Sequence, residues 1–317
     1  MRIVFLDRAT IGPSVKVVRP DVEHEWVEFD RTLESQVVDR LQGAQVVITN
    51  KVPLQASTLE QLPDLQMISV AATGYDVVDI DACRKHNISV SNVRGYAVNT
   101  VPEHTFSLIL GLRRSIAAYQ QDVINGEWQK AAQFCFFNHP IRDLAGSRLG
   151  IIGEGAIGQS VATIARAFGM EPVFAAHKGV SGLGPLYTPW DEVIETADII
   201  TLHAPLTANT RHCLSTAEFA RMKKKPLIIN TARGGLVDEA AIADALEAGQ
   251  ISGLGFDVLS TEPPSADNPI MRVLGRPDVV LTPHIAWASE EAMQEVWRQT
   301  IDHINAFVEG TPRNVLT

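Results

Sequence analysis

The chain has 317 residues, of which 45% are apolar and 20% are charged, and its formal net charge is −10. This length predicts two domains or one large α/β unit, because single domains contain roughly 100–200 residues. The negative charge argues against a nucleic-acid-binding protein, and no apolar run approaches the roughly 20 residues of a membrane span.

The first third of the chain alternates short β-branched runs with amphipathic stretches, which is typical of a parallel sheet covered by helices. Its first apolar run is too short for a signal peptide, so we expect a cytoplasmic protein that begins with a strand. The predicted strands are Arg2–Leu6, Gln45–Thr49, Gln66–Ala71 and Ile88–Asn92. The helical stretches between them are Leu33–Leu41 and Val77–His86.

A longer helix is predicted to begin near Thr100 and Pro102, because proline suits the first helical turn and Glu103 favours the positive end of the helix dipole. We expect it to continue to about Asn125. Apolar residues surround much of its circumference, which predicts deep burial or a subunit contact.

The middle of the chain has six predicted strands, enough for a complete dinucleotide-binding unit. They are Leu149–Ile152, Pro172–Ala175, Ile199–Leu202, Leu227–Asn230, Gly253–Val258 and Val279–Leu281. The last predicted helix, Ser289–Val308, has no strand after it and could pack back on the first domain. We therefore predict an α/β protein in which a domain of residues 99–286 interrupts a domain of residues 1–98 and 287–317.

A glycine-rich loop, Gly153-Glu-Gly155-Ala-Ile-Gly158, follows the first strand of the middle region directly and precedes a predicted helix. This position predicts a dinucleotide site: Gly153 permits the tight turn, Gly155 the close approach of a pyrophosphate, and Gly158 the packing of helix on strand. The alternative is a glycine turn in an ordinary βα unit.

The next strand ends at Ala176, where an NAD-binding protein commonly carries an acidic residue for the adenosine ribose. His177 and Lys178 follow instead. An absent acid and a present cation favour a 2′-phosphate, so NADP(H) is slightly favoured over NAD(H). Lys178 could also be a solvated loop residue, in which case either cofactor would bind through backbone contacts.

Three later strands are each followed by one unusual polar residue, at the strand ends where open α/β sheets bind ligands. Arg233 offers a planar fork for a substrate carboxylate, and His284 is a proton donor suited to neutral pH. Glu262 could bind the far imidazole nitrogen and favour the protonated ring. Singly, the arginine could cap a helix, the glutamate could lie on a loop surface and the histidine could be buried in a core.

The three residues together predict hydride transfer to a 2-oxo acid, with Arg233, Glu262 and His284 as the catalytic residues. No metal site is predicted, because no histidine pair has ligand spacing such as HExxH. The three cysteines form no CxxC pair and predict neither a disulfide framework nor a zinc site.

Motifs along nearly the whole chain resemble those of the D-isomer-specific 2-hydroxyacid dehydrogenases. They are Val70-Ala-Ala-Thr-Gly-Tyr-Asp, Val101-Pro-Glu-His, the glycine loop, Leu202-His-Ala-Pro-Leu206, Asn230-Thr-Ala-Arg-Gly-Gly, Phe256-Asp-Val-Leu and Thr282-Pro-His-Ile. The resemblance implies a Rossmann-type cofactor domain inserted into a flavodoxin-like substrate domain, usually in a homodimer. Through Phe5-Leu-Asp-Arg-Ala-Thr and His284-Ile-Ala-Trp-Ala-Ser, the chain is most similar to the bacterial glycerate dehydrogenase, or hydroxypyruvate reductase, branch.

The resemblance also implies binding roles for individual residues. The substrate carboxylate would bind to backbone amides of the loop Ala72-Thr73-Gly74 and to Arg233. The cofactor would contact the glycine loop, including Ala156 and Ile157, and also His177, Lys178 and His284. Its other contacts would be Thr100, His203, Ala204, Pro205, Thr210, Thr231, Ala232, Asp257 and Ala286.

Several alternatives to a glycerate-type enzyme remain at this stage. A phosphoglycerate or D-lactate type of 2-hydroxyacid dehydrogenase would share the same motifs. Oxidation of formate or phosphite is a further enzymatic alternative. A non-catalytic, dinucleotide-sensing protein of the co-repressor kind would also retain the three polar residues.

Overall fold

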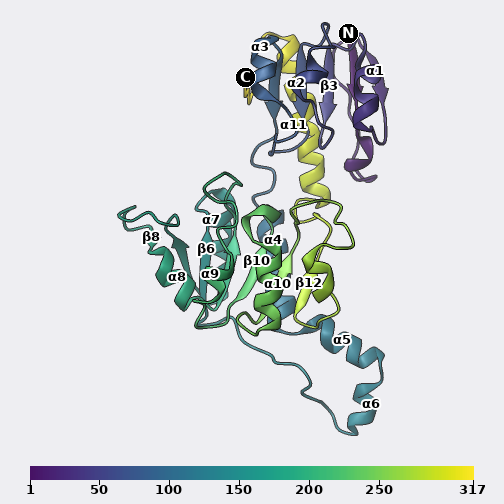
Figure 1. Cartoon of the computed structure of the whole chain (residues 1–317). Coiled ribbons are helices and arrows are strands. Elements are labelled where there is room, and N and C mark those ends of the chain that lie inside the picture. The colour runs from purple at the N-terminus through teal and green to yellow at the C-terminus, as the bar shows by residue number, and fades with distance from the viewer. The chain divides into compact units, whose positions relative to one another are not determined.

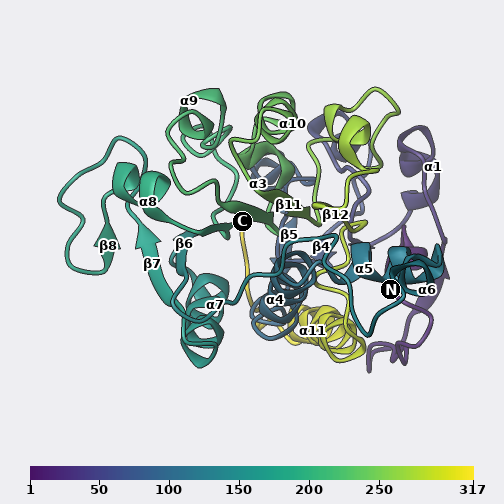
Figure 2. The same cartoon turned by 90° about the horizontal axis from the view of Figure 1, so that it is seen from below.

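The computed structural model describes all residues from 1 to 317 and divides the chain into two compact units. Unit 1 contains Met1–Ala97 and Ala288–Thr317, and unit 2 contains Val98–Trp287. These limits differ by one residue from the boundaries expected from the sequence. Each unit has a parallel sheet with helices on its faces (Figure 1, Figure 2), which confirms the predicted fold class of two doubly wound α/β domains.

Unit 1 contains a five-stranded parallel sheet with the flavodoxin-like order β2-β1-β3-β4-β5. Its strands are β1 (Arg2–Phe5), β2 (Glu25–Glu28), β3 (Val46–Thr49), β4 (Met67–Val70) and β5 (Ser89–Asn92). Every residue of β3 and β4 is buried, because helices cover both faces of a parallel sheet. The edge strand β2 was not predicted from the sequence, and its residues are exposed or half-buried.

The helices of unit 1 are α1 (Val37–Leu41), α2 (Ala56–Leu59), α3 (Ile80–Lys85) and α11 (Glu290–Val308), with short 3₁₀ segments η1 (Arg8–Thr10) and η2 (Glu34–Gln36). The last helix, α11, packs against β4. Trp297 is fully buried, and its ring stacks on Phe5 with 5.3 Å between centroids. The Ser69 hydroxyl donates to the Thr300 carbonyl at 3.1 Å. These contacts attach the last helix to unit 1.

Unit 2 contains a seven-stranded parallel sheet with the order β12-β11-β10-β9-β6-β7-β8. Its strands are β6 (Arg148–Ile152), β7 (Glu171–Ala175), β8 (Tyr187–Thr188), β9 (Ile199–Leu202), β10 (Leu227–Asn230), β11 (Gly253–Phe256) and β12 (Val279–Leu281). Six of them match predicted strands, and the short edge strand β8 was missed. The order reverses between β6 and β9, where open α/β sheets bind ligands beyond the carboxyl ends of the strands.

The helices of unit 2 are α4 (Thr100–Arg113), α5 (Ile116–Ile124), α6 (Glu127–Ala131), α7 (Ala156–Ala167), α8 (Trp190–Thr196), α9 (Thr216–Phe219) and α10 (Glu239–Glu247), with 3₁₀ segments η3 (Gly234–Leu236) and η4 (Pro269–Val273). No helix of the protein combines the length and the apolar character that crossing a membrane requires.

The prediction that the helix beginning near Thr100 continues to about Asn125 was wrong. Helix α4 ends at Arg113, and Ser115 has a left-handed backbone with φ of 51°. The Ser115 hydroxyl donates to the Pro140 carbonyl at 2.7 Å, which fixes this turn. Helices α5 and α6 then form an arm that projects from the rest of unit 2 (Figure 1).

Candidate active site

The glycine loop lies at the point where the strand order of unit 2 reverses. Gly153 has φ of 107°, and a Cβ there would lie 2.6 Å from the carbonyl atoms of His203. A Cβ at Gly158 would lie 2.1 Å from the Gly153 carbonyl oxygen, so only glycine allows α7 to begin so close to β6. The two outer glycines are therefore required by packing.

The middle glycine has a different environment. Gly155 precedes α7, and a Cβ placed on it would have no neighbouring atom within 4 Å. This open space adjoins the amino end of a 12-residue helix, whose unpaired N–H groups and dipole attract anions. The residues therefore fit a pyrophosphate, because a bare backbone borders the space and nothing in the protein requires a glycine there.

The end of β7 presents both charge signs. Ala176 is buried, and His177 and Lys178 follow it, as the sequence indicates. The Lys178 ammonium is bound to a carboxylate of the protein, because its Nζ lies 2.7 Å from Glu218 Oε1. Glu154, from the glycine loop, places Oε2 3.9 Å from Nε2 of His177.

The loops after β10 and β11 cross in close contact. A Cβ at Gly234 would lie 1.9 Å from the Leu259 carbonyl carbon, so this glycine is required for the crossing. Arg233 precedes Gly234 and is half-buried, and its guanidinium donates to the Ala232 carbonyl at 2.8 Å. The contact holds the backbone next to Arg233 against the loop that leads to Glu262.

His284 and Glu262 form a direct pair. Nδ1 of His284 lies 2.6 Å from Oε2 of Glu262, a short distance typical of a charge-assisted hydrogen bond. The other oxygen of Glu262 accepts the Leu259 amide at 2.9 Å. His284 is about one quarter exposed, with 26% of its side-chain surface accessible. The pair can therefore present Nε2 of the ring to a small molecule.

Asp257 holds the segment that carries His284. Its buried carboxylate accepts the Ile285 amide at 2.9 Å, the Ala286 amide at 2.8 Å and the Thr282 hydroxyl at 2.5 Å. His284 has a left-handed backbone with φ of 56°, which the two amide bonds after it help to maintain. Asp257 therefore positions His284 through the backbone of the two residues that follow it.

Two further side chains shape the site and were not singled out in the sequence. Asn230 donates from Nδ2 to the Arg233 carbonyl at 2.9 Å and accepts the Ala232 amide at 3.1 Å. The buried Glu239 accepts the Ser260 amide at 2.6 Å and the Ser260 hydroxyl at 2.7 Å. Asn230 thus fixes the loop of Arg233, and Glu239 fixes the loop of Glu262.

Most of the remaining residues expected near a cofactor lie on loops or helix starts that meet at this end of the sheet. The Thr100 hydroxyl donates to the Ala286 carbonyl at 3.0 Å, and Oγ1 of Thr231 lies 3.0 Å from Oγ1 of Thr105. Burial lowers the pKa of His203 to about 3, so its ring is neutral at physiological pH. The other residues of this set are Ala204, Pro205 and Thr210, the last of which donates to the Pro205 carbonyl at 2.6 Å.

The loop Ala72-Thr73-Gly74 belongs to unit 1, where it follows β4. The Thr73 hydroxyl donates to the Val93 carbonyl at 2.8 Å, and the Asn92 side chain donates to the Thr73 carbonyl at 2.7 Å. These bonds fix the loop against the end of β5. The loop is accordingly an ordered segment at the carboxyl end of its own sheet.

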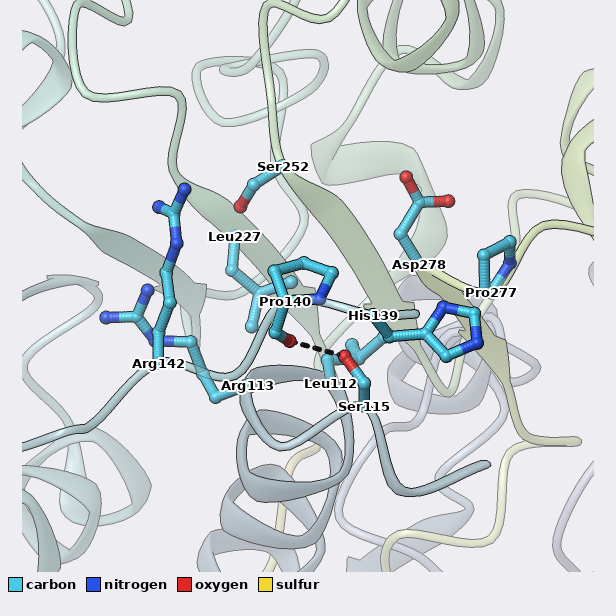
Figure 3. A pocket seen from close by; sticks show the side chains of 10 residues that line it. All are labelled: Leu112, Arg113, Ser115, His139, Pro140, Arg142, Leu227, Ser252, Pro277 and Asp278. Carbon is cyan, nitrogen blue, oxygen red and sulfur yellow. Dashed lines mark hydrogen bonds between the residues drawn. The ribbon is translucent and has the colours of Figure 1, made fainter. Parts of the chain in front are cut away.

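A cavity of about 140 Å³ lies at the opposite end of the sheet of unit 2 (Figure 3). It borders the first residue of β10, Leu227, and the residues just before β11 and β12, Ser252 and Asp278. Arg113 and Arg142 extend side by side along one wall (Figure 3). Because the candidate catalytic residues follow the carboxyl ends of these strands, this cavity is separate from them.

Comparisons with known proteins agree with this arrangement. The profile of the family described as "D-isomer specific 2-hydroxyacid dehydrogenase, NAD binding domain" matches residues 106–286. A glycerate dehydrogenase of Methylorubrum extorquens is 47% identical over 316 residues, which cover 99% of this chain and 98% of the relative. The chain belongs to the D-isomer specific 2-hydroxyacid dehydrogenase family.

More distant relatives extend the comparison. A hydroxypyruvate reductase of Blautia hydrogenotrophica is 33% identical over 323 residues, with 100% of this chain and 99% of the relative covered. A solved acyclic imino acid reductase in complex with NADPH and D-arginine has a TM-score of 0.82 at 27% identity, with 100% of both chains covered. The protein is thus an NAD(P)-dependent oxidoreductase that acts on the CH–OH group of small 2-hydroxy acids.

Proposed function

We propose that this dehydrogenase interconverts hydroxypyruvate and D-glycerate and also reduces glyoxylate. The observation that carries the proposal is near-full-length similarity, at 47% identity, to a glycerate dehydrogenase, in a chain that retains the paired His284 and Glu262. A phosphoglycerate or D-lactate type of activity is the main alternative within the family.

Arg233 is the proposed residue for the substrate carboxylate and carbonyl. A guanidinium has five N–H donors, and one of its nitrogens already bonds the Ala232 carbonyl. The remaining donors suit a planar carboxylate, which arginine binds through two parallel hydrogen bonds. We also assign substrate binding to the backbone amides of Ala72, Thr73 and Gly74, by their match to the family.

His284 and Glu262 are the proposed proton-transfer pair. The bound nicotinamide supplies the hydride that reduces the carbonyl carbon. In that direction His284 donates the proton on Nε2 to the carbonyl oxygen, and in the reverse direction the neutral Nε2 accepts the hydroxyl proton. Glu262 accepts the hydrogen bond from Nδ1, so it orients the ring and leaves Nε2 to exchange the proton with the substrate.

A nicotinamide dinucleotide is the proposed cofactor, with NADP(H) slightly favoured. The pyrophosphate would lie at Gly155 and the amino end of α7, with Gly153, Ala156, Ile157 and Gly158 forming the turn around it. His177 and Lys178 follow the strand end that lacks an acid, and a 2′-phosphate there would meet the Lys178 ammonium and the His177 ring. The Lys178 bond to Glu218 weakens what it can offer, so the preference is expected to be small.

The other cofactor residues are proposed from the family match and from their location on the loops described above. The nicotinamide side is assigned to Asp257, His284 and Ala286, and the remaining contacts to Thr100, His203, Ala204, Pro205, Thr210, Thr231 and Ala232.

A homodimer joined through unit 2 is the proposed assembly. The arm of α5 and α6 (Figure 1) carries exposed apolar side chains, with Ile124 66% and Trp128 49% exposed. In the segment that follows α6, Phe134 is 88% exposed and Phe137 is 82% exposed. Exposed apolar patches of this kind mark interaction surfaces. We also propose a cytoplasmic location and free small anions as substrates. The net charge of −10 argues against nucleic acid as a partner.

Initial rates of NADPH and NADH oxidation with hydroxypyruvate test this function. Arg233→Ala should lower kcat/KM by about a thousandfold, because a fixed cation that polarises a carbonyl commonly contributes this much, and it should leave NADPH affinity within about threefold. Arg166→Ala, an exposed arginine on α7, is the matched control and should keep full activity. Unchanged rates for Arg233→Ala would exclude its assigned role.

A further inference from the structure

The end of β7 is next to a carboxylate even though the strand itself lacks one. Glu154, the residue between the first two glycines of the loop, places Oε2 3.9 Å from Nε2 of His177. His177 comes two residues after the end of β7, where dinucleotide-binding sheets receive the adenosine ribose. An acidic group is therefore present in this region, supplied by the glycine loop after β6.

A neighbouring strand holds this glutamate in place. Tyr187 lies on β8, which pairs with β7, and its side chain hydrogen-bonds to Glu154. Partial burial first, and then the Glu154 carboxylate, raise the pKa of Tyr187, so its hydroxyl stays protonated and able to donate. The ring of Tyr187 also contacts that of His177 edge-on, with centroids 6.0 Å apart. Glu154, His177 and Tyr187 thus form one cluster, which we call the β7-end cluster.

The Glu154 carboxylate of this cluster lies near the end of β7, where Lys178 supplies a positive charge. The ammonium of Lys178, the residue after His177, is bound to Glu218 at 2.7 Å and to the Cys213 carbonyl at 3.3 Å. The Glu154 side chain is 37% exposed, so a ligand can reach it. A carboxylate accepts hydrogen bonds from ribose hydroxyls and repels a phosphate on the same ribose.

We propose that Glu154 is the residue that sets the choice between NAD(H) and NADP(H), by accepting the hydroxyls of the adenosine ribose and repelling a 2′-phosphate. The proposal rests on the dinucleotide site proposed above. It also explains why the preference for NADP(H) is expected to be small. Position 176 carries alanine where an acidic residue is common, and Glu154 of the glycine loop supplies a carboxylate instead.

Binding of two small nucleotides tests the role of Glu154 without turnover. Calorimetry would measure Kd for adenosine 2′,5′-bisphosphate and for ADP with the wild-type protein, with Glu154→Gln and with Glu171→Gln. The Glu154→Gln variant keeps the shape of the side chain and removes its charge. Glu171 is exposed at the opposite end of β7, so its variant is the matched control.

We expect Glu154→Gln to lower the Kd of adenosine 2′,5′-bisphosphate about tenfold relative to the Kd of ADP. Removal of one nearby negative charge changes the affinity for a phosphate by about this much. The ratio of kcat/KM for NADPH over NADH should rise by a similar factor, and thermal melting should not change. A ratio within twofold of the wild-type value, with both nucleotides still bound, would overturn the role of Glu154 alone. If the wild-type protein binds neither nucleotide, the proposed location of the cofactor site is wrong.

Discussion

Replacing Gly155 by alanine separates cofactor binding from folding. The new Cβ would meet no atom within 4 Å, and the φ of −65° and ψ of −177° at this residue suit alanine. Alanine lowers the conformational entropy of the unfolded chain, which stabilises the folded protein. This gain offsets the cost of alanine at the N-cap of α7, where glycine is the better residue. We therefore expect the free energy of unfolding to change by less than about 1 kcal/mol. The methyl group would, however, occupy the space assigned to the pyrophosphate.

Gly158→Ala is the contrasting variant in the same loop. Its Cβ would lie 2.1 Å from the Gly153 carbonyl oxygen, so β6 and α7 must move apart. Overpacking of this kind costs about 1–3 kcal/mol. Thermal unfolding and NADPH titration by fluorescence would compare both variants with the wild-type protein.

We expect Gly155→Ala to keep the wild-type melting temperature within about 2 °C and to weaken NADPH binding at least about tenfold. Gly158→Ala should melt at a clearly lower temperature. If Gly155→Ala bound NADPH with wild-type affinity, the pyrophosphate would not lie at this glycine and our assignment of the loop would be wrong.

Three further predictions follow from the site and from the buried groups. Glu262→Gln should lower kcat for hydroxypyruvate reduction by about a hundredfold, because His284 loses the carboxylate that binds Nδ1. NADPH binding should not weaken. An unchanged kcat would show that the pair is not catalytic. Burial raises the pKa of Asp7 above its ordinary value. The protonated carboxyl therefore favours the folded state at low pH, and this contribution to stability is lost as the pH rises through the folded-state pKa. The Asp7 carboxylate accepts the Asn50 and Lys51 amides, so Asp7→Asn also loses hydrogen bonds. The free energy of unfolding of Asp7→Asn, measured in urea, should nevertheless rise relative to that of wild type as the pH increases from 4 to 7; a relative fall would contradict this. Burial raises the pKa of Cys83 to about 12 and of Cys213 to about 11, so a thiol reagent should label only the half-buried Cys135 in the native protein and all three thiols in denaturant.

The central strands of both sheets were predictable from the sequence because their β-branched runs are buried on both faces. The edge strand β2 was not, because Glu25 and Glu28 are exposed and the strand has no continuous apolar run. The end of α4 was also missed. Apolar residues continue past Arg113, and the break depends on a tertiary bond from Ser115 to Pro140, which no local pattern indicates.

The paired His284 and Glu262 followed from the rule that ligands bind beyond the carboxyl ends of parallel strands. The supporting residues Asn230 and Glu239 did not. Glu239 lies in the first turn of α10, where an acidic residue is ordinarily explained by the helix dipole. Only the structure shows that its carboxylate bonds the loop leading to Glu262. The contact of Glu154 with the end of β7 was missed for the same reason, since the residue is adjacent to glycines in sequence and to His177 only in space.

The most direct test of the account is a comparison of initial rates for hydroxypyruvate, glyoxylate and pyruvate, each with NADPH and with NADH, followed by absorbance of the reduced cofactor. We predict efficient reduction of hydroxypyruvate and glyoxylate with both cofactors, and kcat/KM for pyruvate at least about tenfold lower. Reduction of pyruvate in preference to both would indicate a D-lactate type of enzyme. Binding of cofactor without turnover of any 2-oxo acid would contradict the proposed function and favour formate or phosphite oxidation, or a dinucleotide-sensing role.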